Sequence, residues 1–128
     1  MRGRLAAALI TAGVLLHGGI AIYSGAQSHA ANSLAFSVGL FLWASSPYVA
    51  CAFLLFRMRM TRAAAGAALL ALLMDITSAY TAFVKPSSST SSLVLLFVPL
   101  WNLLVACPIG GFGGWLLSRR AERRASVV

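Results

Sequence analysis

Hydrophobic residues along the chain fall into four long runs that short polar segments separate. The runs cover residues 5–23, 34–56, 63–84 and 93–117, so each holds 19 to 25 residues. A helix needs about 20 apolar residues to cross the hydrocarbon core of a bilayer. Because lipid offers the backbone no hydrogen-bond partners, each run is expected to form an α-helix. The pattern predicts an all-α membrane protein, a four-transmembrane-helix bundle that makes residues 1–128 a single integral membrane domain.

Composition agrees with this pattern and argues against an enzyme. Hydrophobic residues make up 60% of the chain and charged residues only 9%, whereas about a quarter of the residues of a soluble domain are charged. The polar segments between the runs are too short to form a soluble catalytic domain. We therefore expect a non-enzymatic protein whose main environment is the lipid bilayer.

The positive charges are predicted to lie on one side of the membrane. Nine of the ten basic residues precede the first run, separate the second from the third or follow the fourth, and only Lys85 lies on the other side. By the positive-inside rule, both termini are cytoplasmic and residues 118–128 form a basic cytoplasmic tail. This distribution explains the net charge of +8 without nucleic acid. In overall character the chain resembles small bacterial inner-membrane proteins, so we expect a multi-pass protein of the bacterial inner (cytoplasmic) membrane. The nine residues are Arg2, Arg4, Arg57, Arg59, Arg62, Arg119, Arg120, Arg123 and Arg124.

The first run also has features of a secretory signal. Arg2 and Arg4 precede it, and the small residues Ser28, Ala30 and Ala31 follow it. Its apolar stretch is longer than the roughly 7–15 residues of a signal core. We therefore expect a retained helix, with a cleaved signal peptide as the alternative.

Asp75 is the single acidic residue within the four runs. A charge at the centre of a membrane helix costs roughly 2.5–3.5 kcal/mol on insertion scales, so it needs a partner. Ala68, Ala71 and Asp75 recur at spacings of three and four, which places them on one helical face. Small residues let helices approach closely, so this face should point into the protein.

A second face of small residues is predicted in the fourth run. Asn102, Ala106, Gly110 and Gly114 follow one another at intervals of four. Gly110 and Gly114 form a GxxxG motif, which is typical of close helix contacts. The contact can lie within the chain or between two copies in a homo-oligomer, and the sequence leaves both open.

One polar residue in each run is predicted to lie at a similar depth. From the helical rise, His17 and Asp75 lie about 18 Å from the cytoplasmic side, Ser46 about 15 Å and Asn102 about 22 Å. Pro47 removes the hydrogen-bond donor to the Trp43 carbonyl, and the neighbouring serines are expected to replace it. The four polar residues form either a hydrogen-bonded network that fixes the helices or a relay for protons or cations.

Other chemistry is not expected. Ser45 or Ser46 with His17 and Asp75 provides the residue types of a hydrolytic triad, but neither serine lies in a strained GxSxG turn, so we predict no catalytic residue. Cys51 and Cys107 lack the CxxC spacing or histidine neighbours of a metal site. We therefore predict no metal and no cofactor.

In length and number of spans the chain is similar to small multidrug transporters, which act as dimers around a glutamate in the first helix. Here the first run contains His17 and no acid, so the resemblance implies no site residue.

Two functions are consistent with these features. We expect an accessory or interaction subunit: a complex component, an assembly factor or an immunity-type protein. It would pack against a membrane-protein partner or another copy through its Gly/Ala faces. The alternative is an oligomeric, proton-linked carrier or channel for small solutes, in which Asp75 and His17 handle the proton and Ser46 and Asn102 contact the solute.

Overall fold

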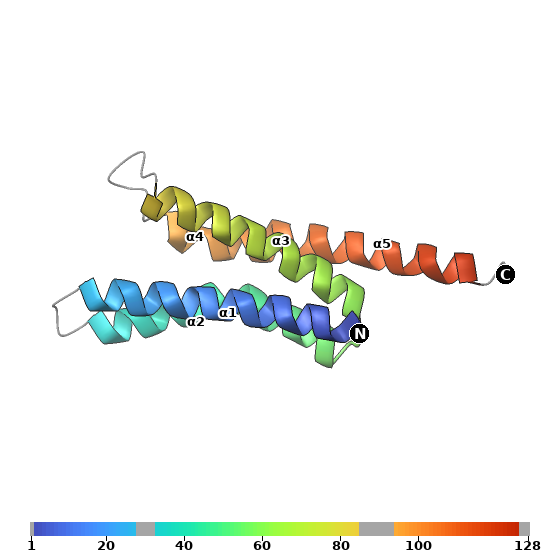
Figure 1. Ribbon diagram of the computed structural model, residues 1–128, viewed down its shortest axis with the longest axis horizontal. Helices are drawn as coiled ribbons and strands as arrows, with labels where there is room; N and C mark the ends of the chain where they lie inside the picture. The colour runs from blue at the N-terminus through green and yellow to red at the C-terminus, as the bar shows by residue number, and fades with distance from the viewer. Residues whose placement is uncertain (1, 28–32, 85–93, 126–128) are drawn as a thin grey trace.

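The computed structural model describes residues 2–27, 33–84 and 94–125, and nearly all of them are helical (Figure 1). Two π-helical segments, η1 and η3, each extend or interrupt an α-helix. In chain order the elements are α1 (Arg2–Gln27), α2 (Ser33–Phe56), α3 (Thr61–Ala79), η1 (Tyr80–Val84), α4 (Val94–Trp101), η3 (Asn102–Ala106) and α5 (Cys107–Ala125).

Within these residues, four helical stretches are long and apolar enough to cross a membrane: Gly3–Tyr23, Leu34–Phe56, Thr61–Val84 and Leu96–Ala121. This confirms the predicted all-helical chain with four helices of spanning length. The first, third and fourth stretches differ from the predicted runs by a few residues at their ends. The fourth combines α4, η3 and α5, and its helix continues to Ala125, through much of the predicted tail.

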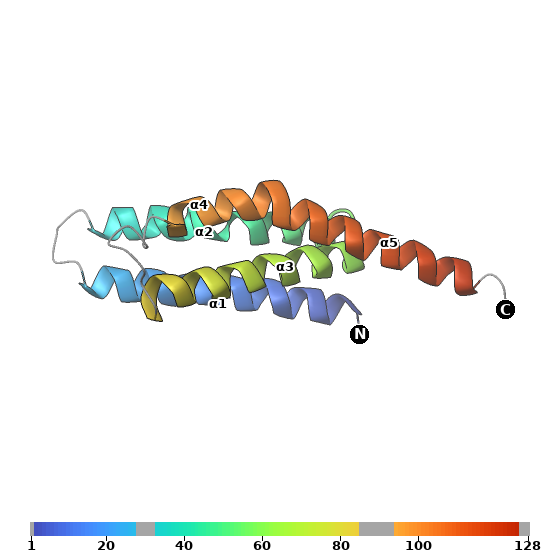
Figure 2. The ribbon, with the colours of Figure 1, turned by 90° about the horizontal axis from the view of Figure 1, so that it is seen from above.

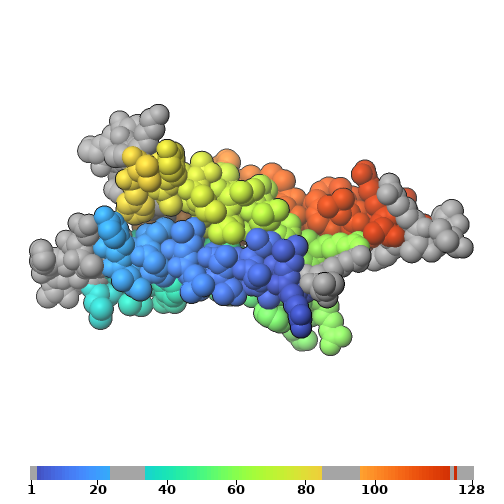
Figure 3. Space-filling model, in the orientation of Figure 1, coloured from blue at the N-terminus to red at the C-terminus, as the bar shows by residue number. Residues whose placement is uncertain are grey.

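The helices run alternately in opposite directions along the long axis (Figures 1 and 2). The N-terminus, the α2–α3 connection and the C-terminal half of α5 lie at the same end, and α5 extends beyond the other helices there. These are the three segments of the chain in which the sequence has its arginines, so the arginine-bearing segments lie at one end of the protein. On the face shown in Figure 3, α1 lies along α3, with which it is in contact.

Small side chains fill the interior, and large apolar ones cover the outside. The core contains Ala6, Ala64, Ala67, Ala68 and Ala71, which are completely buried. Large residues such as Leu, Ile and Phe are mostly exposed along all four spans. This distribution of small and large apolar side chains is opposite to that of a soluble domain. It suits a protein surrounded by lipid, because lipid solvates apolar side chains as well as a protein core does.

The backbones of α3 and α5 are in direct contact. A Cβ at Gly110 would collide with the backbone at Gly66, and a Cβ at Gly114 would collide with the backbone at Arg62 and Ala63. Ala106 is buried nearby. Both glycines of the GxxxG motif therefore pack against α3 of the same chain.

Candidate functional site

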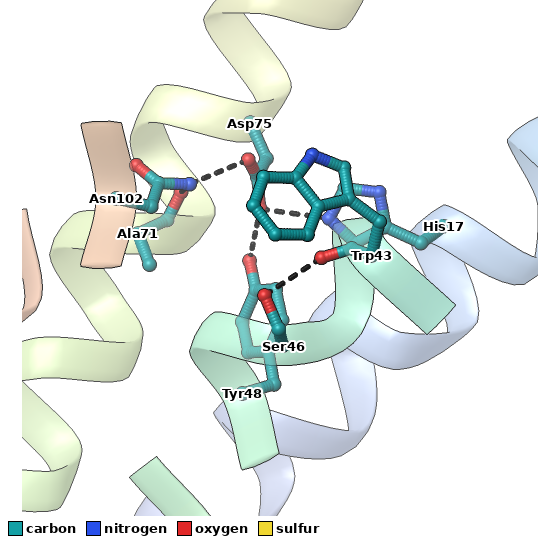
Figure 4. Close-up of polar contacts among 7 residues, drawn as sticks. All are labelled: His17, Trp43, Ser46, Tyr48, Ala71, Asp75 and Asn102. Carbon is teal, nitrogen blue, oxygen red and sulfur yellow. Dashed lines mark hydrogen bonds and ion pairs between the residues drawn. The ribbon is translucent and has the colours of Figure 1, made fainter. Parts of the chain in front are cut away.

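The Asp75 carboxylate lies in the interior and contacts one polar side chain from each of the other three spans (Figure 4). Its Oδ2 is 3.0 Å from Nε2 of His17 and accepts a hydrogen bond of 2.5 Å from the Tyr48 hydroxyl. Its Oδ1 accepts a hydrogen bond of 2.7 Å from Nδ2 of Asn102. We call His17, Tyr48, Asp75 and Asn102 the polar cluster. All four residues are buried.

A glycine on α1 creates the space for the Tyr48 ring. A Cβ at Gly13 would overlap this ring, so no larger residue fits there without moving it. Gly13 and His17 are four residues apart and lie on the same face of α1. The His17 and Tyr48 rings lie 5.8 Å apart, centroid to centroid, and both point toward Asp75. This face of α1 thus positions two of the three side chains that contact the carboxylate.

Asn102 enters the cluster at the first residue of η3. Besides its bond to Asp75, its Nδ2 lies 3.5 Å from the Ala71 carbonyl oxygen. A π-helical turn holds an extra residue and is often found at functional sites. Among the described residues, Asn102 Oδ1 and Ser45 Oγ are buried without a hydrogen-bond partner. The contacts of its NH₂ group, and not of its carbonyl oxygen, therefore orient the Asn102 amide.

The charge of Asp75 has a local counterpart. A carboxylate buried in apolar surroundings is costly unless donors or an opposite charge compensate it. When Nδ1 of His17 carries a hydrogen, one further proton between Nε2 of His17 and Oδ2 of Asp75 makes the pair neutral overall, whichever of these two atoms holds it. The hydrogen bonds from Tyr48 and Asn102 fit either position, because each leaves acceptor capacity on the carboxyl oxygens. The cluster can thus hold a proton at its centre without a net buried charge.

The structure brings together His17, Asp75 and Asn102 of the predicted polar layer, but not Ser46. The Ser46 hydroxyl donates a 2.7 Å hydrogen bond to the Trp43 carbonyl on its own helix (Figure 4). This is the carbonyl that Pro47 leaves without a donor, so the expected backbone repair is present. Ser46 was included because its depth is similar, and depth does not determine the direction in which a side chain points.

Tyr48 is the cluster residue that the sequence analysis missed. It lies two positions after Ser46, a rotation of about 200° around the helix axis, and so points to the opposite side. Ala44, Tyr48, Cys51 and Leu55 recur at spacings of four and three and are all buried. That periodicity is visible in the sequence and would have identified the inward face of α2.

A small cavity of about 20 Å³ adjoins the cluster on the side away from the arginines. His17, Asp75 and Ser78 line it together with apolar residues such as Phe41 and Pro99. It is large enough for one water molecule with polar neighbours. The cavity can hydrate the cluster, but its volume does not accommodate a solute larger than water.

Neither a hydrolytic triad nor a metal site is assembled in the part of the chain that the structure describes. The Ser46 hydroxyl bonds to its own helix, and the buried Ser45 hydroxyl has no hydrogen-bond partner, so neither serine bonds to His17. No group of three or more His, Cys, Asp or Glu side chains gathers among the described residues.

No family model, curated protein or solved structure matches this chain.

Proposed function

We propose that the protein is a non-enzymatic accessory or interaction subunit of the bacterial inner membrane, and that the polar cluster fixes the arrangement of its four spans. The observation that carries this proposal is the pairing of Asp75. Both carboxyl oxygens contact donors, and these come from three other helices. A carboxylate held in this way favours one arrangement of the helices, because any separation leaves buried polar groups unpaired.

The size of the interior supports an interaction role over transport. A carrier has to admit its solute to the site and to change its access from one side to the other. Here the cavity beside His17 and Asp75 measures about 20 Å³. The specific observation that favours the alternative, a proton-linked carrier, is the contact between His17 and Asp75, since such a pair can exchange one proton.

The partner surface has to lie outside the Gly/Ala faces. Ala68, Ala71, Ala106, Gly110 and Gly114 were expected to bind a partner helix, but they pack inside the chain. The outward faces of the spans, with their large apolar side chains, therefore remain for a partner protein or another copy.

The orientation that we propose places both termini in the cytoplasm. The arginine-bearing segments, which are the start of α1, the α2–α3 connection and the C-terminal half of α5, lie at one end, and this supports it through the positive-inside rule. Lys85, the basic residue expected on the opposite side, lies outside the described residues. We also propose that the first span is retained, because α1 contributes His17 to the cluster and buries Ala6; residues 28–31, where cleavage would occur, lie outside the described residues.

Reporter fusions test this orientation. A fluorescent protein that matures only in the cytoplasm should be bright when fused after Val128, and alkaline phosphatase should be active only when inserted near Ser88. A tag placed before Met1 should remain in the membrane fraction. Active phosphatase at the C-terminus would contradict the orientation, and loss of the tag would show that the first span is cleaved.

Crosslinking followed by pull-down from the native membrane in mild detergent tests the interaction role. We expect one partner, or a second copy, in a fixed ratio to the tagged chain. Liposomes that contain the purified protein and a trapped pH-sensitive dye provide the second measurement. A subunit without transport activity should give no proton flux, whereas flux that disappears in Asp75→Asn at normal abundance would favour the carrier and overturn our proposal.

A further inference from the structure

Cys51 and Cys107 face each other between α2 and α5, outside the polar cluster. Their sulfur atoms are 3.9 Å apart, and both side chains are buried. They belong to a core group with Tyr48, Ala67 and Ala68. A disulfide has a sulfur–sulfur distance of roughly 2 Å, so a side-chain adjustment of about the same size would join them. The two thiols are therefore in direct contact before any oxidant acts.

Cys107, which is 8% exposed, is one of the residues that line an apolar groove. The groove has a volume of about 940 Å³, runs along the outer flank of α2 and α5, and includes Cys107 in its lining. Phe53 comes from α2, and Phe112 and Trp115 come from α5. The Phe112 and Trp115 rings are stacked, with centroids 5.6 Å apart and an angle of 28° between their planes. The groove thus gives a flat, lipid-soluble molecule access to Cys107.

We propose that Cys51 and Cys107 form a redox-active dithiol that a lipid-soluble quinone, entering through this groove, oxidises to an intramolecular disulfide. In the reaction a bond forms between the two sulfur atoms and both S–H bonds break. The two electrons and two protons pass to the quinone, which becomes a hydroquinone. The product links α2 covalently to α5.

The chemistry of the groove selects this oxidant. Cellular disulfides such as oxidised glutathione are charged and would lose their hydration in an apolar groove. A quinone is uncharged, dissolves in lipid, accepts two electrons, and has a planar ring that can stack on aromatic side chains. The same burial keeps the pair apart from the water-soluble thiols that reduce cytoplasmic disulfides. This inference does not depend on the polar cluster or on the proposed interaction role.

The test uses the full chain, reduced and reconstituted in liposomes without oxygen, and a fully substituted benzoquinone such as decylubiquinone, whose ring has no free carbon for thiol addition. After denaturation, the remaining thiols are counted with a maleimide reagent that shifts gel mobility. We expect both thiols of the chain to disappear, with one hydroquinone formed per chain and a monomeric product on a non-reducing gel. Unchanged thiols, a disulfide-linked dimer, or equal quinone reduction by Cys51→Ala would overturn the proposal.

Two glycine variants test the groove itself. Gly111 lines the groove, and a Cβ there would come no closer than 3.9 Å to its nearest neighbour, so the leucine of Gly111→Leu can be attached without a backbone clash at Cβ and is expected to occupy the groove. Gly113 belongs to a different flank, and a Cβ there meets nothing described within 4 Å, which makes Gly113→Leu the control.

Gly111→Leu should slow oxidation by the quinone roughly tenfold, the size of effect expected when a side chain of this size occupies an apolar pocket, while Gly113→Leu should react like the natural chain. Diamide, a small permeable oxidant, should oxidise all three proteins at similar rates, which would show that the cysteine pair is intact. Equal quinone rates in Gly111→Leu and Gly113→Leu would exclude the groove as the route.

Discussion

Replacing Asp75 with alanine is expected to destabilise the protein more than any other change in the polar cluster. The variant removes the acceptor that His17, Tyr48 and Asn102 share. A buried polar group without a partner costs about 1–3 kcal/mol, and three such groups come from three different helices. The removed carboxylate no longer has to be desolvated, but the remaining groups cannot regain water without separating the spans. We therefore expect a lower unfolding temperature in detergent and less protein in the membrane.

The two buried cysteines provide the measurement. A dye that becomes fluorescent on reacting with thiols reports the temperature at which Cys51 and Cys107 become accessible. Asp75→Asn should lower the unfolding temperature less than Asp75→Ala does. One oxygen remains as an acceptor, but the new NH₂ group faces other hydrogen-bond donors. Thr77→Val is the control on the same helix, since Thr77 is exposed and bonds to the Leu73 carbonyl of its own helix. Equal unfolding temperatures for Asp75→Ala and Thr77→Val would contradict a structural role of the cluster.

Gly110→Ala is expected to cause a comparable loss through packing alone. Its Cβ would fall on the Gly66 carbonyl and the adjacent backbone of α3, and backbone atoms cannot rotate away as a side chain can. Overpacking of a core costs about 1–3 kcal/mol when side chains can adjust, so a collision between two backbones should cost more. To relieve it, α5 has to move away from α3. The unfolding temperature should therefore fall, with a yield well below that of the natural chain.

The neighbouring glycine supplies a matched control. Gly113→Ala introduces the same side chain on the same helix, where a Cβ meets nothing described within 4 Å. Since alanine favours helix over glycine by about 1 kcal/mol, Gly113→Ala should unfold at the same temperature as the natural chain or above it. A similar loss in both variants would mean that helix propensity or insertion, rather than the α3–α5 contact, controls stability.

The sequence was sufficient to predict the helices and much of the inward face. Four long apolar runs determine four helices, because lipid leaves the backbone no other way to satisfy its hydrogen bonds. Asp75 was placed inside by the small residues on its own face, and His17 and Asn102 were grouped with it by depth. Depth is one coordinate along a helix axis. It did not distinguish Ser46 from Tyr48, because that distinction depends on rotation around the axis.

Other features required the structure. The GxxxG motif is the same whether its partner helix is in this chain or in another copy, so its contact with Gly66 could not be assigned. The pairing of Cys51 with Cys107 depends on the relative rotation of two helices that are far apart in sequence. The sequence also predicted regular steps of four from Asn102 to Gly114, without the π-helical segment at 102–106.

The wide turn at η3 divides the last span into two halves whose orientations are set separately. A π-helical turn holds about one residue more than an α-helical turn, and each residue of an α-helix advances the rotation by about 100°. Deleting Leu104, which is exposed, would restore an α-helical turn. It would also rotate Trp101 and Asn102 around the helix axis, while Gly110 would keep its contact with Gly66. The single additional residue therefore sets the rotation of α4 about the helix axis, which directs Asn102 toward Asp75, and it leaves the packing of Gly110 on α3 unchanged.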